Sequence, residues 1–523
     1  MEAYKKLLKE EVEILRGKGH EFLEGTLSRN EFKGFSGGMG SYAQKETGKF
    51  MIRLRTPSGI VTVQHFGLIL DYAQKYGLDK IHLTTRQAIQ LHDLDIDSVC
   101  DIMKDAIDHD LFTRGGGGNF PRNVALSPMA GVDPEEAFDV TPYARQVGDY
   151  FFRNATGYKL PRKLKVAFSS NALDTGCATV NDMGFIGVVH DGKPMFKLWL
   201  AGGMGSQPAL GIPYDECVAP GEVLYYVEAM VRLFMAEGDY ENKAKARIRF
   251  IPRRMGAEAF IECYKKHLET VRKECHFDGI EPFVWNEHAG LGMTETVSPD
   301  GGTANTLILP QKQEGKYTVV LHPLCGQLTV SDGRKIQRIL AAIPEAEIRL
   351  SMDEEMYIRN LSKDEAENLL KAMEGRMGMT PVRMSVSCVG TPTCQTGVNQ
   401  SQKLCQAVEA AVAAADLDEA RLPRLYISGC PNCCSRHAAA ALGFSGRKLK
   451  VNGVMAEAFD CFIGGNVCMD ASVLAQKAGT ILADKIPEMI VALGEMLTKE
   501  KKNYSDALAD GTAEAFIQKY CQA

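Results

Sequence analysis

Apolar residues between positions 50 and 106 occur in short alternating runs, separated by stretches with helical spacing. The runs predict strands at residues 50–55, 80–84 and 88–92. One helix face is predicted at Phe66, Ile69, Leu70 and Ala73, and a second at Val99, Ile102, Met103 and Ala106. Gly77 stands where a glycine ends a helix. The pattern predicts a unit of mixed α and β structure.

The same pattern occurs a second time, 267 residues further along the chain. Residues 48–54 (GKFMIRL) match residues 315–321 (GKYTVVL). The same ungapped shift aligns Gly59 with Gly326, Ile81 with Ile348 and Leu94 with Leu361. Ser362 and Glu365 predict a capping box at the start of the matching helix. A shorter echo, Leu-Pro-Arg, occurs at 160–162 and 422–424. We therefore expect an α+β (mixed α/β) fold made of two copies of one half.

The two copies differ in charge at equivalent positions. Arg86 corresponds to Asp353, Arg53 to Val320, and His92 to Arg359. Drift on a solvated surface would produce such differences, and so would an anion site confined to the first copy. The second explanation predicts a site at the junction, where basic groups of the first half meet residues of the second.

The composition is that of an ordinary globular enzyme, with 45% hydrophobic and 24% charged residues in 523 positions. The formal net charge of −6 argues against a nucleic-acid-binding protein, because no basic field dominates. Residues 1–15 show no signal peptide, and no apolar run is long enough to cross a bilayer. The 15 cysteines do not resemble a secreted disulfide framework, so we expect a cytoplasmic protein.

The chain also lacks the glycine motifs of nucleotide-binding domains. It contains neither a P-loop nor a strand–GxGxxG–helix sequence. The four glycines at 115–118 by themselves predict a flexible loop. No nucleotide domain is therefore expected to supply electrons within this chain.

Four cysteines near the C-terminus carry the strongest chemical signal. Cys388 and Cys394 stand in CVGTPTC, and Cys430 and Cys434 stand in CPNCC. Four thiolates suit an iron–sulfur cluster or a zinc ion, but five residues between paired cysteines are unusual for structural zinc. Ordinary buried thiols are the alternative, and they describe most of the 15 cysteines. Two tight pairs in the same glycine and proline setting favour the cluster.

Four short segments place cations beside glycine, proline or amide residues. They are 51–55 (MIRLR), 85–92 (TRQAIQLH), 121–123 (PRN) and 160–165 (LPRKLK). In a strand, Lys163 and Lys165 point to the same face, where two ammonium groups repel unless an anion lies between them. Taken alone, each segment is most simply a solvated charged face.

Taken together, these cysteine and cation motifs and the tandem repeat resemble the sirohaem-containing nitrite/sulfite reductase family, in particular its sulfite reductase haemoprotein branch. The resemblance runs from about Gly40 to the end of the chain. It implies a pseudo-twofold multi-domain reductase with ferredoxin-like repeat units. The implied parts are an N-terminal arm (1–44), repeat 1 (45–118), a sirohaem and substrate domain (119–310), repeat 2 (311–377) and a cluster and sirohaem domain (378–523).

The resemblance also implies the cofactors, sirohaem and a 4Fe-4S cluster, and the residues that hold them. The expected cluster ligands are Cys388, Cys394, Cys430 and Cys434. Cys434 is expected to ligate the sirohaem iron as well, with the adjacent Cys433 as the alternative bridging sulfur. The positions expected to contact sirohaem are Arg86, Gln90, His92 and Asn432. The positions expected to surround the substrate are Arg53, Arg122, Lys163 and Lys165.

These residue types suit the six-electron reduction of sulfite to sulfide. Arginine binds oxyanion oxygens through paired hydrogen bonds, and a lysine crowded by other cations can protonate a departing oxygen. Ferredoxin or a flavoprotein is the expected external electron donor. The nearest alternative is a ferredoxin-type nitrite reductase, a branch that commonly has Asn at the position of Lys165. Remoter alternatives are the precorrin-hydroxylating branch and, from another class, a zinc-stabilised binding protein.

Overall fold

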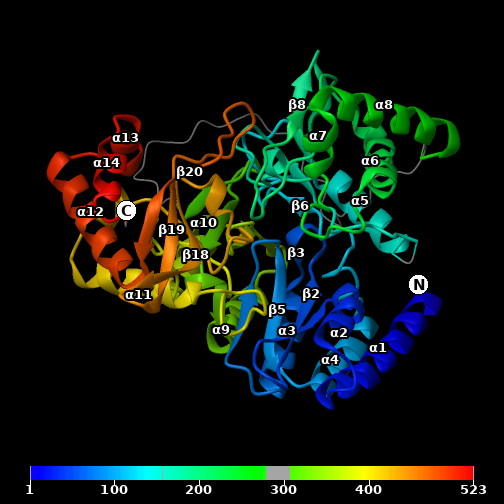
Figure 1. The fold of residues 1–523 in the computed structure, drawn as a ribbon, viewed down its shortest axis with the longest axis horizontal. Coiled ribbons are helices and arrows are strands. Elements are labelled where there is room, and N and C mark those ends of the chain that lie inside the picture. Colours follow the sequence, from blue (N-terminus) through cyan, green and yellow to red (C-terminus); the bar gives the residue numbers. More distant parts are fainter. Residues whose placement is uncertain (1, 156, 278–306, 522–523) are drawn as a thin grey trace.

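The structure is a computed structural model that describes residues 2–155, 157–277 and 307–521. Within these residues, the strands form four five-stranded sheets, which fall into two related pairs (Figure 1). One sheet of the first pair has the order β1 (Ser41–Ala43), β2 (Phe50–Arg55), β5 (Ala88–Leu94), β4 (Lys80–Leu83), β13 (Gln327–Thr329). Its counterpart has the order β11 (Ile308–Pro310), β12 (Tyr317–Leu321), β15 (Met356–Leu361), β14 (Glu347–Leu350), β3 (Ile60–Val61).

Each repeat lends one strand to the sheet of the other. β13 pairs antiparallel with β4, and β3 pairs antiparallel with β14. The shift of 267 residues equates β3 with β13, so the exchange is reciprocal. The helices that follow, α3 (Val63–Lys75) and α9 (Val330–Leu340), pack against each other. Buried apolar residues of both repeats consequently form one shared core.

The predicted elements are present, with small differences at their ends. β2 has the predicted bounds, β4 ends one residue earlier than predicted, and β5 continues two residues further. The predicted helix faces lie in α3 and in α4 (Ile96–Asp108). Gly77 adopts a φ of +67° after α3, and a capping box at Ser362 opens α10 (Lys363–Ala372). The predicted mixed α/β fold with duplicated halves is therefore confirmed.

The second pair of sheets combines parallel and antiparallel strands. One has the order β10 (Ile212–Pro213), β9 (Lys193–Leu200), β8 (Met183–His190), β7 (Val166–Ser169), β6 (Ala125–Leu126). The other has the order β16 (Val386–Ser387), β17 (Leu425–Ser428), β18 (Leu442–Val451), β19 (Val454–Ile463), β20 (Gln476–Leu482). In both sheets the first three strands in sequence are parallel. The loops that leave the carboxyl ends of these strands therefore meet at one edge of each sheet.

Each sheet of the second pair belongs to a larger part of the chain that also contains helices, and further helices cover the first repeat. The first part carries α5 (Thr141–Arg153), α6 (Val223–Glu237), α7 (Phe250–Met255) and α8 (Ala257–Glu274). The second carries α11 (Ser401–Ala414), α12 (Ile486–Glu500), α13 (Tyr504–Ala509) and α14 (Thr512–Gln518). At the N-terminus, α1 (Glu2–Leu23) packs against α4, and α2 (Arg29–Ser36) follows it (Figure 1). No helix in the described residues is both long and apolar enough to span a membrane.

Candidate active site

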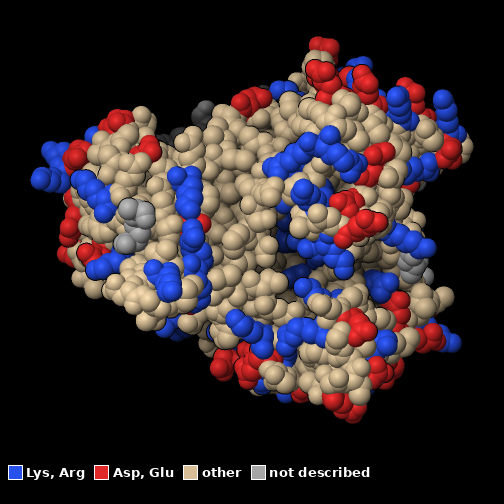
Figure 2. Space-filling model, viewed as in Figure 1, with Lys and Arg blue, Asp and Glu red and all other residues tan. Residues whose placement is uncertain are grey.

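A cavity of about 1030 Å³ lies where the two halves meet. Its walls come from β2, β5, the glycine run, the segment before β7, and the loops after β16 and β17. Figure 2 shows Lys and Arg side chains around a recess between the region of α6–α8 and the N-terminal helices. Every site residue predicted from the sequence lines this cavity: Arg53, Arg86, Gln90, His92, Arg122, Lys163, Lys165, Cys388, Cys394, Cys430, Asn432 and Cys434.

The charge of the cavity wall is strongly one-sided. Among the described residues that line it there is one carboxyl group, that of Glu354. Burial raises the pKa of Glu354 well above its usual value and so opposes the ionisation of this carboxyl group. The lining cations are Lys33, Arg53, Arg55, Arg86, Arg122, Arg162, Lys163, Lys165, Lys243, Arg247, Arg249 and Arg436. Such a wall attracts anions and is stabilised when one binds.

Arg86 is held rigidly in the turn between β4 and β5. Its Nε donates to Asn123 O at 2.9 Å, Nη1 to Asn181 Oδ1 at 2.8 Å, and Nη2 to Val166 O at 2.7 Å. Burial lowers the pKa of Arg86 to about 9, which still leaves the guanidinium charged at pH 7. The three acceptors are uncharged, so the positive charge of Arg86 is not cancelled by an ion pair.

Lys163 and Lys165 flank Leu164, which forms an isolated parallel β-bridge with Pro121 and is fully buried. Alternation along this extended segment places both lysines on the cavity wall, as the sequence predicts. Neither ammonium group has a hydrogen-bond or ion-pair partner within the described residues. Burial and then the charge of Arg122 lower the pKa of Lys163 to about 7. Burial and then the charge of Arg86 lower the pKa of Lys165 well below its usual value.

Gln90 joins Arg53 to His92 on adjacent strands β2 and β5. In the amide orientation that satisfies both neighbours, Gln90 Oε1 accepts from Arg53 Nε at 2.7 Å, and Gln90 Nε2 donates to His92 Nε2 at 3.0 Å. Burial lowers the pKa of His92 to about 4, so its ring is neutral at pH 7 and can accept this bond. Because the neutral His92 ring accepts the amide N–H, the amide oxygen of Gln90 faces Arg53 and helps to orient its guanidinium group.

The four predicted cluster cysteines lie at neighbouring strand ends. β16 and β17 are parallel neighbours, so the loops after them start at the same edge of the sheet. Gly429 N donates to Cys388 Sγ at 3.2 Å, which links the two loops directly. Burial and then the charges of Cys434 and Cys394 raise the pKa of Cys430 to about 11. Thiols that oppose one another's ionisation in this way are stabilised as thiolates when a metal centre binds.

Among the described residues, no three His, Cys, Asp or Glu side chains converge closely enough to hold a single metal ion. Both adjacent cysteines line the cavity, but Cys434 is exposed, whereas Cys433 is buried. Cys433 Sγ accepts from Ala438 N at 3.4 Å and lies 3.9 Å from Met204 Sδ. Thr85 Oγ1 donates to Cys434 O at 2.9 Å and thereby ties the first half to the second. This geometry favours Cys434 over Cys433 as the bridging sulfur.

Sequence reasoning missed part of the cation wall. Arg247 and Arg249 belong to the segment 243–249, KAKARIR, whose period-two spacing of basic residues was the available signal. Arg247 Nη2 donates to Asp182 Oδ2 at 2.8 Å, and Arg249 Nε donates to Gln207 O at 2.6 Å. Tyr42 on β1 was also missed, and its hydroxyl accepts from Gly118 N at 2.7 Å.

Several buried donors on this wall have no partner within the described residues. They are Arg55 Nε, Arg122 Nε, Arg247 Nε and Arg249 Nη1. Buried donors without acceptors are costly. A bound group rich in carboxylate oxygens, together with a small oxyanion, would satisfy them. The donor set therefore fits a polyanionic prosthetic group.

Two protein-family domains match most of the first half of the chain and part of the second half. "Nitrite and sulphite reductase 4Fe-4S domain" matches residues 117–271. "Nitrite/Sulfite reductase ferredoxin-like half domain" matches residues 42–108 and 309–376. The two half-domain matches coincide with the two strand-exchanged repeats.

Curated relatives cover most of the chain at low identity. The chain is 28% identical to the ferredoxin–nitrite reductase of Synechococcus elongatus over 459 residues, 85% of each protein. It is 27% identical to the chloroplastic ferredoxin–nitrite reductase of Zea mays, over 81% of the chain and 74% of the relative. It is 23% identical to sulfite reductase (ferredoxin) 1 of Mycolicibacterium paratuberculosis, over 84% of the chain and 81% of the relative.

A solved structure has the same fold. The Mycobacterium tuberculosis NirA protein superposes with a TM-score of 0.77, with 22% identity over 94% of this chain and 92% of that one. The likeness extends to the mixed α/β architecture with its duplicated halves.

Proposed function

Because the chain belongs to the nitrite and sulfite reductase family, we propose that it reduces a small oxyanion, nitrite or sulfite, with six electrons taken from a separate donor protein. The observation that carries the proposal is the cavity at the junction. It brings a cation wall from the first half against the four cysteines of the second half. That combination provides an anion site beside a site for an electron-transfer centre.

The cofactors of this enzyme are sirohaem and a 4Fe-4S cluster. Cys388, Cys394, Cys430 and Cys434 would hold the cluster, and Cys434 would also ligate the sirohaem iron. The carboxylates of sirohaem would be bound from Arg86, Gln90, His92 and Asn432. When bound, the two cofactors would carry the electrons from the donor protein to the anion. The four cysteines serve this cluster rather than the zinc ion of the remoter alternative.

The residues of the chain would bind the anion and deliver protons to it. Arg53 and Arg122 remain charged and would hold the oxygens by charge-assisted hydrogen bonds. Lys163, with its pKa lowered to about 7, both carries and releases a proton near neutral pH. A group of that pKa suits repeated protonation of departing oxygens. Lys165 would add a second ammonium donor from the same face.

The curated relatives favour nitrite as the substrate. The two relatives of higher identity are named ferredoxin–nitrite reductases, and the sulfite reductase has lower identity. These names support the nitrite alternative better than the sulfite reduction that the sequence motifs favour. Nitrite reduction to ammonia is accordingly the first candidate.

Sulfite is the second candidate, because of Lys165. Sulfite approaches a dianion near neutral pH, whereas nitrite carries a single charge. Lys163 and Lys165 both line the cavity, and neither forms an ion pair within the described residues, an arrangement that favours the more highly charged anion.

An external ferredoxin is the proposed electron donor. The chain has no nucleotide-binding motif, and the relatives' names include ferredoxin. The purified holoenzyme should turn over nitrite or sulfite with reduced ferredoxin or methyl viologen, and not with NADPH alone. Comparison of kcat/KM for the two anions on one preparation identifies the substrate. Absence of turnover with both anions, from a preparation that contains both cofactors, would refute the proposed function. The cytoplasmic location stays a prediction.

A further inference from the structure

The glycine run 115–118 forms hydrogen bonds to both arginines proposed to bind the anion, whereas Gln90 contacts Arg53 alone of the two. Gly116 O accepts from Arg53 Nη1 and, at 2.8 Å, from Arg122 Nη1. Gly118 O accepts from Arg122 Nη2 at 2.8 Å. No carboxylate among the described residues forms an ion pair with either guanidinium group. Two like charges that repel each other are therefore held together by carbonyl oxygens of one short loop.

This loop is fixed, although the sequence alone predicts a flexible one. Gly115 N donates to Gly38 O at 2.8 Å, Gly116 N to Thr113 O at 2.9 Å, and Gly118 N to Tyr42 Oη at 2.7 Å. These bonds engage three of the four amides of the run. The loop therefore presents its carbonyl oxygens in defined directions.

The path of the loop depends on glycine at its third position. A Cβ atom on Gly117 would lie 2.3 Å from Tyr42 Oη and 2.3 Å from Gly37 O. A contact of that length forces the loop or the tyrosine to move. Gly38 lies beside the loop, but a Cβ atom there would meet nothing within 4 Å. The two glycines thus form a matched pair for substitution.

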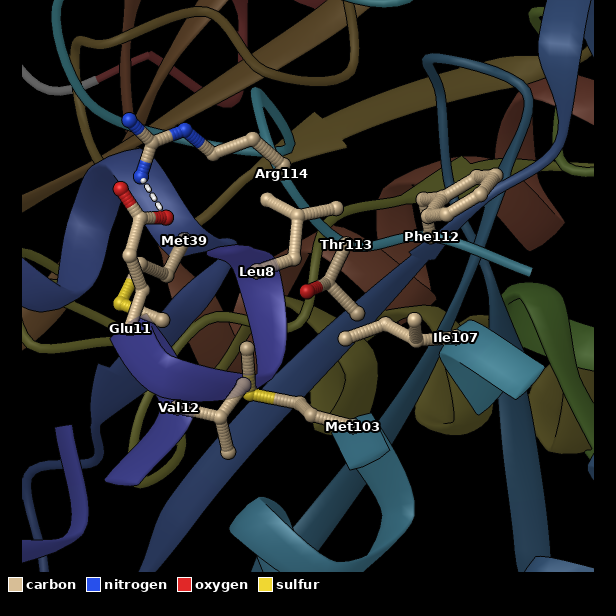
Figure 3. Close-up of a pocket in the computed structure, with 9 residues that line it drawn as sticks. All are labelled: Leu8, Glu11, Val12, Met39, Met103, Ile107, Phe112, Thr113 and Arg114. Carbon is tan, nitrogen blue, oxygen red and sulfur yellow. Dashed lines mark hydrogen bonds and ion pairs between the residues drawn. The ribbon is translucent and has the colours of Figure 1, made fainter. Parts of the chain in front are cut away.

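The N-terminal helix anchors the residue that precedes the run. Arg114 Nη1 lies 2.8 Å from Glu11 Oε2, and the side chains are 21% and 23% exposed. Figure 3 shows this ion pair beside a pocket in which Leu8 of α1 lies next to Thr113 and Val12 of α1 lies next to Met103, with Phe112 also in the lining. The segment that enters the glycine run is therefore fixed by α1 through charge and through packing.

We propose that the glycine run, anchored to α1 by the Glu11–Arg114 ion pair, is the element that positions Arg53 and Arg122 for the substrate anion. The identity of the anion rests on the proposed function, whereas the positioning does not. Gly116, Gly118, Glu11 and Arg114 are positioning residues that act through the two arginines. The N-terminal helix is thereby part of the active-site support.

The experiment compares Gly117→Ala with Gly38→Ala, and Glu11→Ala with Lys9→Ala. Lys9 also joins α1 to the first repeat, through Asp108, but it does not contact the loop. Two measurements are made on each full-length holoenzyme with its cofactor content recorded. The first is kcat and KM for nitrite and for sulfite with reduced methyl viologen. The second is amide hydrogen exchange across residues 112–122.

Because misplacement by about 1 Å costs up to roughly 100-fold in rate, Gly117→Ala should lower kcat/KM by about ten- to a hundredfold. Glu11→Ala should mainly raise KM, by about three- to tenfold, and should speed amide exchange in the loop. Gly38→Ala and Lys9→Ala should match the wild type in both measurements. Unchanged kinetics in Gly117→Ala, or equal loop exchange in Glu11→Ala and Lys9→Ala, overturns the positioning proposal. A wild-type holoenzyme that reduces neither anion refutes the proposed function instead, and loop exchange still tests the positioning.

Discussion

Arg424 Nη1 lies 3.4 Å from Asp353 Oδ2 in the second half of the chain. The internal repeat equates these two residues with Arg162 and Arg86 of the first half. An ion pair in one half therefore corresponds to two unpaired cations on the cavity wall in the other. This difference supports the proposal that the anion site belongs to the first half, because only there do the equivalent positions leave positive charge on the cavity wall.

Two more ion pairs neutralise charged residues in the second half. Asp353 also pairs with Arg436, and Arg424 Nη1 lies 2.8 Å from Glu355 Oε1. Burial opposes the ionisation of Asp353, but the guanidinium groups of Arg436 and Arg424 outweigh it and lower its pKa. Asp353 thus contributes stability at neutral pH that is lost as the pH falls through its lowered pKa.

Substitutions at the two equivalent positions should have different consequences. Arg86→Ala removes three hydrogen bonds and a charge from the cavity wall, and should lower sirohaem content by roughly tenfold or more. Asp353→Asn removes no side chain from the cavity wall but breaks the ion pairs that Asp353 forms with Arg424 and Arg436, and should cost about 1–3 kcal/mol of unfolding free energy. Haem absorbance per protein and chemical denaturation separate the two effects. Equal haem content in both variants would count against placing sirohaem against Arg86.

The cluster and sirohaem should be lost together when Cys434 is replaced. Cys434 is exposed, whereas its neighbour Cys433 is buried against Met204 and bonded to Ala438 N. Cys434→Ser should therefore disturb the iron–sulfur and haem spectra in the same preparation, and Cys433→Ala should preserve both. The measurements are iron and acid-labile sulfide content and the visible spectrum. If Cys433→Ala alone removes both cofactors, the bridging assignment belongs to Cys433.

Much of this site was predictable because its residues lie in short local motifs. The period-two strands put Arg53, Gln90 and His92 on neighbouring β-strands, and the paired cysteines fall at the ends of parallel strands. The strand exchange between repeats was not predictable, because β3 and β13 are too short to specify a partner by their own sequence.

The rest of the site depends on long-range contacts. Arg249 enters the wall from an irregular segment, so the period-two spacing of basic residues at 243–249 does not belong to a strand that would indicate which way its side chain points. The glycine run is fixed by Tyr42 and Gly38, which lie far from it in the sequence. Such partners have no signature in the four glycines themselves, so the loop was predicted to be flexible.

The affinity for nitrite should depend on pH through Lys163. Burial and neighbouring cations lower its pKa to about 7, so the ammonium form dominates below that pH and the neutral amine above it. Nitrite keeps one charge across this range, so KM should rise by up to roughly tenfold between about pH 6 and about pH 8. Lys163→Arg stays charged and should flatten this rise. An identical pH profile in wild type and Lys163→Arg would assign the titration to another group.

The preference between the two anions should depend on Lys165. Lys163 and Lys165 lie on the same face of the segment before β7, and both line the cavity. A second ammonium group favours the doubly charged sulfite over the singly charged nitrite, both in binding and in protonating a departing oxygen. Lys165→Asn keeps a hydrogen-bonding group but deletes the charge. The loss of one charge-assisted contact costs about 1.5–3 kcal/mol, so sulfite kcat/KM should fall by roughly ten- to a hundredfold.

Nitrite kcat/KM should fall less in Lys165→Asn, or rise, because nitrite needs one compensating charge and Lys163 still provides it. The measurement is the ratio of the two kcat/KM values in wild type and variant, at one pH and with one electron donor. Lys163→Asn is the matched control, since it removes a charge from the same face and should impair both anions. An unchanged ratio in Lys165→Asn would show that this lysine does not set the preference. The case for sulfite would then lose its structural support, and nitrite, which the curated relatives favour, would stand as the substrate.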